Sequence, residues 1–232
     1  MLLAHGIFCD KTEFGRFDRL AAELARAGLA SLRFDFRGHG EHALPPIRAT
    51  IGGMLLDFVT ALETLRSRFP VPASCVAASF GGSIALLALQ SPCAPALHRL
   101  MLLNPVVDYA STFLEPQGQI LREAFSAEKW ERLNALGFIE PIPGIRLGRV
   151  FASELALLRP YAAFERLNVP TRIVHGTADR RVSHDATRRF ASESPSVEFV
   201  SIVGADHAFI PEPEERRSFD LVLEWLSASA VA

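Results

Sequence analysis

Short apolar segments alternate along most of this chain with longer segments of helical periodicity. Six apolar runs have the length and composition of buried strands, at residues 2–5, 30–34, 73–78, 99–103, 171–175 and 197–203. Between them, apolar residues recur at steps of three and four, which indicates helices that bury one face. Because strands joined by helices form a parallel sheet covered on both faces, we predict an α/β fold with a mostly parallel, six-stranded sheet.

Several of the predicted helices have recognisable ends. The first helix carries Phe14, Phe17 and Leu24 on one face and ends at Gly28, a residue type common at helix C-termini. Another helix begins directly after Ser79, and a closing helix covers residues 214–228. These helices alternate with the strands, as a parallel sheet requires.

Nearly 60 residues separate the fourth predicted strand from the fifth, far more than a connection between neighbouring parallel strands needs. Helical periodicity is present there at residues 120–136 and 153–159, with a Pro-Ile-Pro-Gly turn between the two stretches. We therefore predict a single domain whose core is formed by residues 1–108 and 168–232 and whose helical cap is the insertion 109–167.

Charge and cysteine content restrict the partners and the compartment. The 24 basic and 26 acidic residues leave a net charge of −2, so we expect no nucleic-acid partner. The chain has no run of about 18 apolar residues, so we expect no membrane-spanning helix. Cys9, Cys75 and Cys93 lack the spacing of a disulfide framework or a zinc site, which favours a reducing, cytoplasmic location. The oligomeric state stays open.

Ser79 lies at a predicted junction of strand and helix, within the letters AASFGG. Small residues two positions before and after it, Ala77 and Gly81, permit the sharp turn that exposes a nucleophilic hydroxyl. A serine that caps the N-terminus of an ordinary helix would explain the same segment. The segment alone leaves both interpretations open.

A serine becomes a nucleophile at neutral pH only when a base takes its proton and an acid orients that base. Asp179 follows one predicted strand and His207 follows the next. Because the carboxyl ends of parallel strands meet at one edge of the sheet, we expect these side chains to lie near Ser79. Taken alone, Asp179 can be explained as a turn residue and His207 as a residue of a surface loop. Together with Ser79 they form a candidate catalytic triad.

Acyl transfer also needs hydrogen-bond donors for the developing oxyanion. Gly6 follows the first strand and would allow the Ile7 N–H to point at the site. The Phe80 N–H, directly after the candidate nucleophile, is the second candidate donor.

Five segments together resemble the α/β-hydrolase superfamily, and within it the serine-aminopeptidase-like and cinnamoyl or feruloyl esterase-like branch. The segments are HG at 5–6, FDFRGHG at 34–40, ASFGG at 78–82, HGTAD at 175–179 and GADH at 204–207. The resemblance implies Ser79 as nucleophile, His207 as base and Asp179 as acid. It also implies the N–H groups of Ile7 and Phe80 as oxyanion donors.

The chain departs from the family pattern in two places. Ala77 replaces the usual first glycine of the nucleophile turn, and Ala78 stands where many relatives have histidine. Relatives also have two or more strands before the His-Gly strand, whereas Met1 opens directly on it. The predicted sheet lacks this N-terminal hairpin, which either exposes a different edge strand or places the true start upstream.

A second motif allows a rival interpretation. The letters GHGEHA at 38–43 fit a dinucleotide-binding fingerprint. Asp57 follows them at a plausible sequence spacing for the acid that contacts the ribose. That fingerprint requires a helix which the prolines at 45–46 oppose. We interpret this segment as a loop near the site and expect Arg37 to pair with a carboxylate.

His39 and His42, with or without His5, suggest a metal site, but no cysteine or second acid stands at ligand spacing. We expect no metal and no cofactor. Asp108 is the alternative to Asp179 as the acid, because it follows the end of the fourth strand, and Asp206 is a weaker alternative beside the histidine.

The expected function is hydrolysis of a small-molecule carboxylic ester through an acyl-enzyme intermediate. The candidate pocket residues are aromatic and favour an apolar or aromatic acyl or alcohol group; they are Phe8, Phe113, Trp130 and Phe138. The same triad serves thioesterases, amidases and acyltransferases, which remain alternatives. A catalytically idle, hydrolase-like binding protein is the alternative from another functional class.

Overall fold

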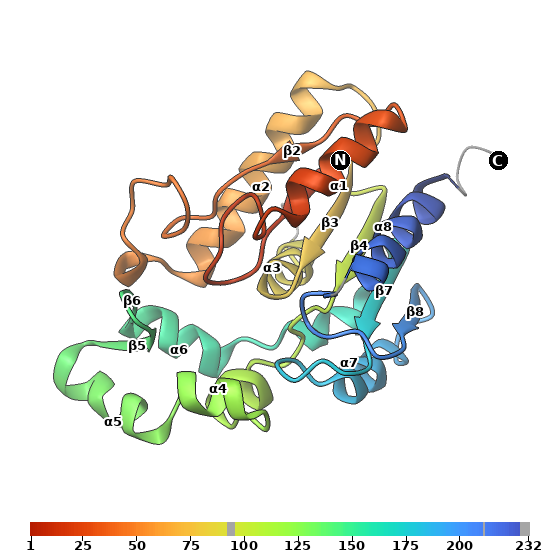
Figure 1. Cartoon of the computed structure of the whole chain (residues 1–232). Coiled ribbons are helices and arrows are strands. Elements are labelled where there is room, and N and C mark those ends of the chain that lie inside the picture. The colour runs from red at the N-terminus through yellow and green to blue at the C-terminus, as the bar shows by residue number, and fades with distance from the viewer. Residues whose placement is uncertain (92–95, 211, 228–232) are drawn as a thin grey trace.

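The computed structural model describes residues 1–91, 96–210 and 212–227 (Figure 1). Its main sheet has six parallel strands in the order β2-β1-β3-β4-β7-β8. The strands are β1 (Leu2–Ala4), β2 (Leu32–Arg33), β3 (Ser74–Ala78), β4 (Arg99–Leu103), β7 (Thr171–Gly176) and β8 (Val197–Ile202). All six predicted strands are thus confirmed, and the predicted ends differ from the observed ones by at most two residues.

The central strands are apolar on both faces because helices cover both sides of the sheet. On one face, Leu2 and Cys75 pack against helices α2 (Ile51–Arg68) and α3 (Phe80–Leu89). On the other face, Leu3 and Val76 pack against α1 (Arg16–Arg26) and α8 (Glu212–Ser227). Figure 1 shows these two helices on the same side of the sheet. The alternation of neighbouring strand residues between two cores produces the continuous apolar runs seen in the sequence.

The first and last helices lie close to their predicted positions, but Phe14, expected on the apolar face of the first helix, lies before it and is 77% exposed. α1 begins after Gly15 and ends before Gly28, whose positive φ of 76° suits a glycine that follows a helix. The closing helix α8 begins at Glu212 and is described up to Ser227. The predicted last residue of that helix, 228, lies outside the described residues.

The segment between β4 and β7 contains helices and one unpredicted hairpin. Its elements are a helical turn at Ala110–Leu114, α4 (Gln119–Ala124), α5 (Ala127–Leu136), β5 (Phe138–Ile142), β6 (Ile145–Gly148), α6 (Arg149–Leu157) and a second helical turn at Pro160–Arg166. The stretch predicted as one helix at 120–136 is divided, because Ser126 starts a new helix by accepting a hydrogen bond from the Lys129 N–H. The predicted Pro-Ile-Pro-Gly turn lies within the antiparallel pair β5–β6.

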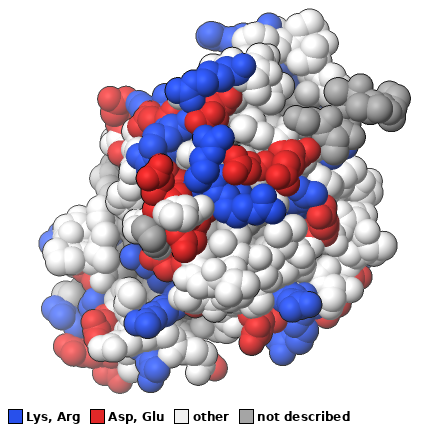
Figure 2. Space-filling model, turned by 45° about the vertical axis from the view of Figure 1, so that its right-hand side comes forward, with Lys and Arg blue, Asp and Glu red and all other residues white. Residues whose placement is uncertain are grey.

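The surface carries charges of both signs side by side, as Figure 2 shows. Helices α1 and α8 are joined by such pairs, Arg19 with Glu215 and Arg216 with Glu23. Among the described residues, no helix has the length and apolar character needed to cross a membrane.

Candidate active site

Ser79 lies on a sharp turn between β3 and α3, with φ 49° and ψ −117°. The turn is held by hydrogen bonds from the Ser79 N–H to the Leu103 carbonyl and from the Gly82 N–H to the Ser79 carbonyl, of 2.9 and 3.0 Å. A positive φ is unusual for a residue with a side chain and is found where surrounding bonds enforce it. The Ser79 side chain makes no capping bond to α3, so the interpretation as an ordinary N-cap does not apply.

The Ser79 hydroxyl faces His207, which in turn contacts Asp179. The distance from His207 Nε2 to Ser79 Oγ is 3.0 Å, and the distance from His207 Nδ1 to Asp179 Oδ2 is 2.7 Å. The carboxylate can only accept, so Nδ1–H donates to it and Nε2 is left to accept from the serine hydroxyl. The structure thus brings together the three side chains predicted to form the triad.

The Asp179 side chain is fully buried and saturated with donors. Its Oδ1 accepts from the N–H groups of Arg181 and Val182, at 2.8 and 2.9 Å. Burial by itself would raise the pKa of Asp179, but hydrogen bonds from His175 and His207 outweigh it and hold the pKa below its usual value. Asp179 is therefore an anion at neutral pH.

His175 is a site residue that the sequence analysis did not assign. Its Nε2 lies 3.2 Å from Asp179 Oδ2, so the Asp179 carboxylate contacts two histidines, His175 and His207. Burial lowers the pKa of His175, which keeps this ring neutral. The signal in the sequence was its spacing, since His175 precedes Asp179 by four residues across the tight turn after β7.

Asn104 also joins the elements of the site without having been predicted. Its side-chain oxygen accepts from the Gly176 N–H at 2.8 Å, and its side-chain nitrogen donates to the His207 carbonyl at 2.6 Å. Asn104 is 1 % exposed and follows β4 with a φ of 44°. It therefore ties the end of β7 to the loop that carries the histidine.

The two alternative acids have other roles. Asp108 Oδ1 accepts from the Ala110 N–H at 3.0 Å, at the start of a helical turn. Asp206 Oδ1 accepts from the N–H groups of Ala208 and Ile210, both at 2.9 Å, and so shapes the loop around His207. Within the described part of the chain, Asp179 is the only carboxylate that hydrogen-bonds to the His207 ring.

The two predicted oxyanion donors flank Ser79 in the chain's fold. A Cβ built on Gly6 would lie 3.1 Å from the Ser79 Cβ, so the Gly6-Ile7 turn packs directly against the serine. Phe80 is the first residue of α3, where backbone N–H groups point out of the helix end. The N–H groups of Ile7 and Phe80 have no acceptor among the described residues, so both remain available to a ligand.

A cavity of about 400 Å³ opens at Ser79 and His207. Two of the predicted pocket residues, Phe8 and Phe113, line it. Trp130 and Phe138 do not, which corrects that part of the prediction: Trp130 stacks on Phe125 with ring centroids 6.1 Å apart, and Phe138 lies under Arg146. Further apolar lining comes from Val106, Leu121, Ile142 and Val182.

The dinucleotide interpretation does not fit the structure. No helix opens on Gly40; the described backbone there is a turn, followed by a short helical turn at Pro46–Arg48. Asp57 is engaged by Arg37, with Nη2–Oδ1 and Nε–Oδ2 distances of 2.7 and 3.0 Å. The predicted pairing of Arg37 with a carboxylate is confirmed.

Ligand atoms of His5, Cys9 and Glu13 lie within 4.8 Å of one another, the only such group among the described residues. The Phe36 N–H donates to His5 Nε2 at 3.1 Å, so the ring proton is on Nδ1 and points to the Gly6 carbonyl, 2.7 Å away. A protonated Nδ1 has no lone pair for a metal. The group therefore fits a hydrogen-bonded cluster better than a metal site.

The partly buried His39 makes the stability of this fold sensitive to mild acid. Burial lowers the pKa of His39 from 6.5 to about 4. Between these values the unfolded chain binds more protons than the folded one, so the free energy of unfolding should fall as the pH drops from 7 to 5. Urea unfolding at both pH values measures this fall, and His39→Gln should reduce it. An equal fall in wild type and variant would contradict the assignment to His39.

Comparisons with known proteins identify the family and the fold of the chain. The model of the alpha/beta hydrolase family matches residues 1–217. Est1E from Butyrivibrio proteoclasticus, in a structure with bound ferulic acid, is 21% identical with a TM-score of 0.77, covering 97% of this chain and 88% of that one. A thermophilic esterase from Thermogutta terrifontis, with malate bound, is 21% identical with a TM-score of 0.69, covering 98% and 89%.

A monoacylglycerol lipase from Paleococcus ferrophilus is 16% identical with a TM-score of 0.69, covering 98% of this chain and 93% of that one. At these identities the structural likeness shows the shared fold alone. The family match spans most of the chain, from the first strand into the closing helix. The chain therefore belongs to the alpha/beta hydrolase family.

Proposed function

We propose that this protein is a serine hydrolase that cleaves carboxylic esters through an acyl-enzyme intermediate. The observation that carries this proposal is the continuous hydrogen-bonded chain from Asp179 through His207 to the Ser79 hydroxyl, at the wall of an apolar cavity. Such a chain supplies the base and the oriented acid that a serine nucleophile requires.

In the proposed reaction, Ser79 Oγ attacks the ester carbonyl while His207 Nε2 takes the hydroxyl proton. Asp179 stabilises the imidazolium that forms, and the N–H groups of Ile7 and Phe80 bind the negative oxygen of the tetrahedral intermediate. The intermediate collapses as His207 gives its proton to the leaving alcohol. Water, activated by the same histidine, then attacks the acyl-enzyme and releases the acid.

The cavity supports an apolar or aromatic group on the substrate. Phe113, Leu121 and Ile142 reach the cavity from the segment between β4 and β7, so we propose that residues 109–167 act as a cap over the reacting bond. The ferulic acid bound to the structurally similar Est1E supports an aromatic acyl group.

Free thiols at Cys9 and Cys75 support a reducing, cytoplasmic location.

A panel of substrates tests this function. We expect p-nitrophenyl esters to be hydrolysed with a higher kcat/KM than the matching thioesters and anilides, and Ser79→Ala to abolish the ester reaction. Greater activity on thioesters or anilides would replace the ester assignment by one of the rival chemistries. No turnover of any substrate by wild type would favour an idle binding protein.

The role of the cap can be tested at Leu121, a half-buried residue on α4 that lines the cavity. Leu121→Trp should fill part of the cavity and lower kcat/KM for an octanoyl ester by about tenfold, with little change for an acetyl ester. Leu157→Trp is the matched control, because Leu157 is 76% exposed on the same segment. Equal losses for both acyl lengths would exclude Leu121 from acyl selection.

A further inference from the structure

The direction of the Ile7 N–H is set by the peptide bond between Gly6 and Ile7. In a trans peptide the N–H points opposite to the carbonyl. The Gly6 carbonyl accepts from His5 Nδ1 at 2.7 Å and from Cys9 Sγ at 3.0 Å. With its carbonyl held on one side, the peptide presents the Ile7 N–H on the other, and this N–H is the oxyanion donor of the proposed function, on which the present inference rests.

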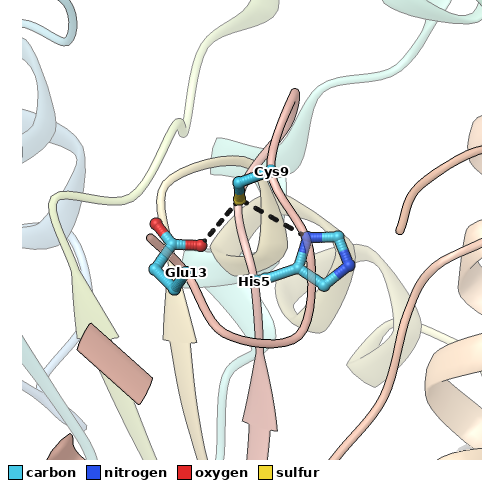
Figure 3. A group of neighbouring side chains, drawn as sticks. All are labelled: His5, Cys9 and Glu13. Carbon is cyan, nitrogen blue, oxygen red and sulfur yellow. Dashed lines mark hydrogen bonds between the residues drawn. The ribbon is translucent and has the colours of Figure 1, made fainter. Parts of the chain in front are cut away.

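Glu13 holds the same turn from a second direction. Its Oε2 accepts from the Gly6 N–H at 2.7 Å and from Cys9 Sγ at 2.9 Å. Figure 3 shows Cys9 between Glu13 and His5, with contacts from its sulfur to both side chains. One carboxylate oxygen therefore contacts both the Gly6 N–H and Cys9, one of the two residues that hold the Gly6 carbonyl.

A buried carboxylate beside a forming oxyanion would oppose catalysis unless its charge were balanced. Arg16 Nη2 lies 3.3 Å from Glu13 Oε1, and the two side chains are only 7% and 10% exposed. The guanidinium also lies near the rings of Phe17 and Phe209. Arg16 thus neutralises the cluster within the protein, so Glu13 can order the loop without repelling the oxyanion.

Cys9 takes part as a donor. Burial, together with the charge of Glu13, raises the pKa of the Cys9 thiol, so the sulfur keeps its proton at neutral pH. The thiol shares that proton between the Gly6 carbonyl and Glu13. A protonated thiol of this kind is neither a nucleophile nor a metal ligand.

We propose that Glu13, acting through Gly6 and Cys9, is a positioning residue that aims the Ile7 N–H at the oxyanion formed on the carbon attacked by Ser79. Glu13 does not touch the substrate carbonyl in this role. Its effect is to keep the Gly6-Ile7 peptide in one orientation before the reaction. A donor that is already oriented stabilises the oxyanion without reorganisation during the reaction.

Two double variants test the proposal while leaving no unpaired buried charge. Both replace Arg16 by Met, and they differ only at position 13, as Glu13→Gln with Arg16→Met and Glu13→Ala with Arg16→Met. The glutamine oxygen can still accept from the Gly6 N–H, whereas alanine cannot. The alanine form should show a kcat about 100-fold below the glutamine form on p-nitrophenyl butyrate, with a similar KM.

A trifluoromethyl ketone supplies a readout that a merely structural role would not move. Ser79 adds to its carbonyl and produces a hemiketal oxyanion, so its inhibition constant should weaken by the same factor as kcat. The affinity for the matching methyl ketone, which stays planar and uncharged, should be nearly equal in the two forms. A change in KM alone, or equal kcat values in two folded forms, would overturn the positioning role.

Cys9 provides a second comparison that does not disturb the ion pair. Cys9→Ala should lower kcat by about tenfold, and Cys9→Ser, which keeps a donor, should recover most of that loss. Equal activity of the alanine and serine variants would contradict the proposed role of the thiol.

Glu63→Ala, an exposed change on α2, serves as the surface control. If wild type itself neither turns over esters nor binds the trifluoromethyl ketone, the proposed function fails; if wild type does both and the paired variants match, only the positioning role fails.

Discussion

Asp179→Asn should lower kcat for ester hydrolysis by about 10⁴-fold. The N–H groups of Arg181 and Val182 would hold the amide oxygen at the Oδ1 position. The amide nitrogen would then face His207 Nδ1 and turn it from a donor into an acceptor. His207 would present Nε2–H to Ser79 and could no longer take the hydroxyl proton. Stopped-flow or steady-state assays with a p-nitrophenyl ester measure the loss.

Asp108→Asn is the matched control for this change. The Asp108 carboxylate accepts only from the Ala110 backbone within the described residues, and an asparagine oxygen can accept the same bond. We expect its kcat to stay within about threefold of wild type, since exposed or turn-forming changes usually cost little. A large loss in Asp108→Asn together with a small loss in Asp179→Asn would reverse the assignment of the acid.

Gly81→Ala should lower the stability of the fold. A Cβ at this position would lie 2.5 Å from the His5 carbonyl oxygen and 2.6 Å from that of Ala4. Both are backbone atoms at the end of β1 and cannot rotate away, so α3 would have to move off the sheet. Overpacking of this kind costs about 1 to 3 kcal/mol in the free energy of unfolding. Because α3 carries Ser79 and Phe80 at its start, kcat should fall as well.

Urea unfolding compares this variant with Gly52→Ala, another glycine-to-alanine change in a helix. A Cβ on Gly52 would meet only the end of the Glu154 side chain, at 3.3 Å, which can move. Alanine in a helix is favoured over glycine by about 0.5 to 1 kcal/mol, so Gly52→Ala should be neutral or stabilising. A Gly81→Ala variant as stable as wild type would contradict the close packing of α3 on β1.

The sheet could be predicted from the sequence because its strands are buried on both faces and therefore appear as uninterrupted apolar runs. β3 and β4 are examples, with almost every residue buried. The meeting of Ser79, Asp179 and His207 followed from the same prediction, since parallel strands bring their carboxyl ends to one edge. Sequence patterns thus placed the residues near one another without giving their contacts.

The hairpin β5–β6 could not be predicted because Pro141 and Pro143 mark a turn but do not reveal the strands beside it. Only two of the four predicted pocket residues line the cavity, for a related reason. Aromatic residues such as Trp130 and Phe113 have the same apolar character, and only the packing of the folded segment decides which faces the cavity. Glu13 was missed because its role depends on contacts with the backbone of Gly6, which no residue pattern records.

In the proposed function, Ser79 is a nucleophile activated by His207. Labelling with a fluorophosphonate probe, followed by intact mass measurement and peptide mapping, tests it most directly, because the probe forms a covalent bond only with an activated hydroxyl. Wild type should gain one phosphonyl group at Ser79, and Ser79→Ala should gain none. Ser201→Ala, which changes an exposed serine on β8, should be labelled as much as wild type. Labelling of wild type no faster than Ser79→Ala, or a label on another residue, would contradict the assignment of Ser79 as the nucleophile.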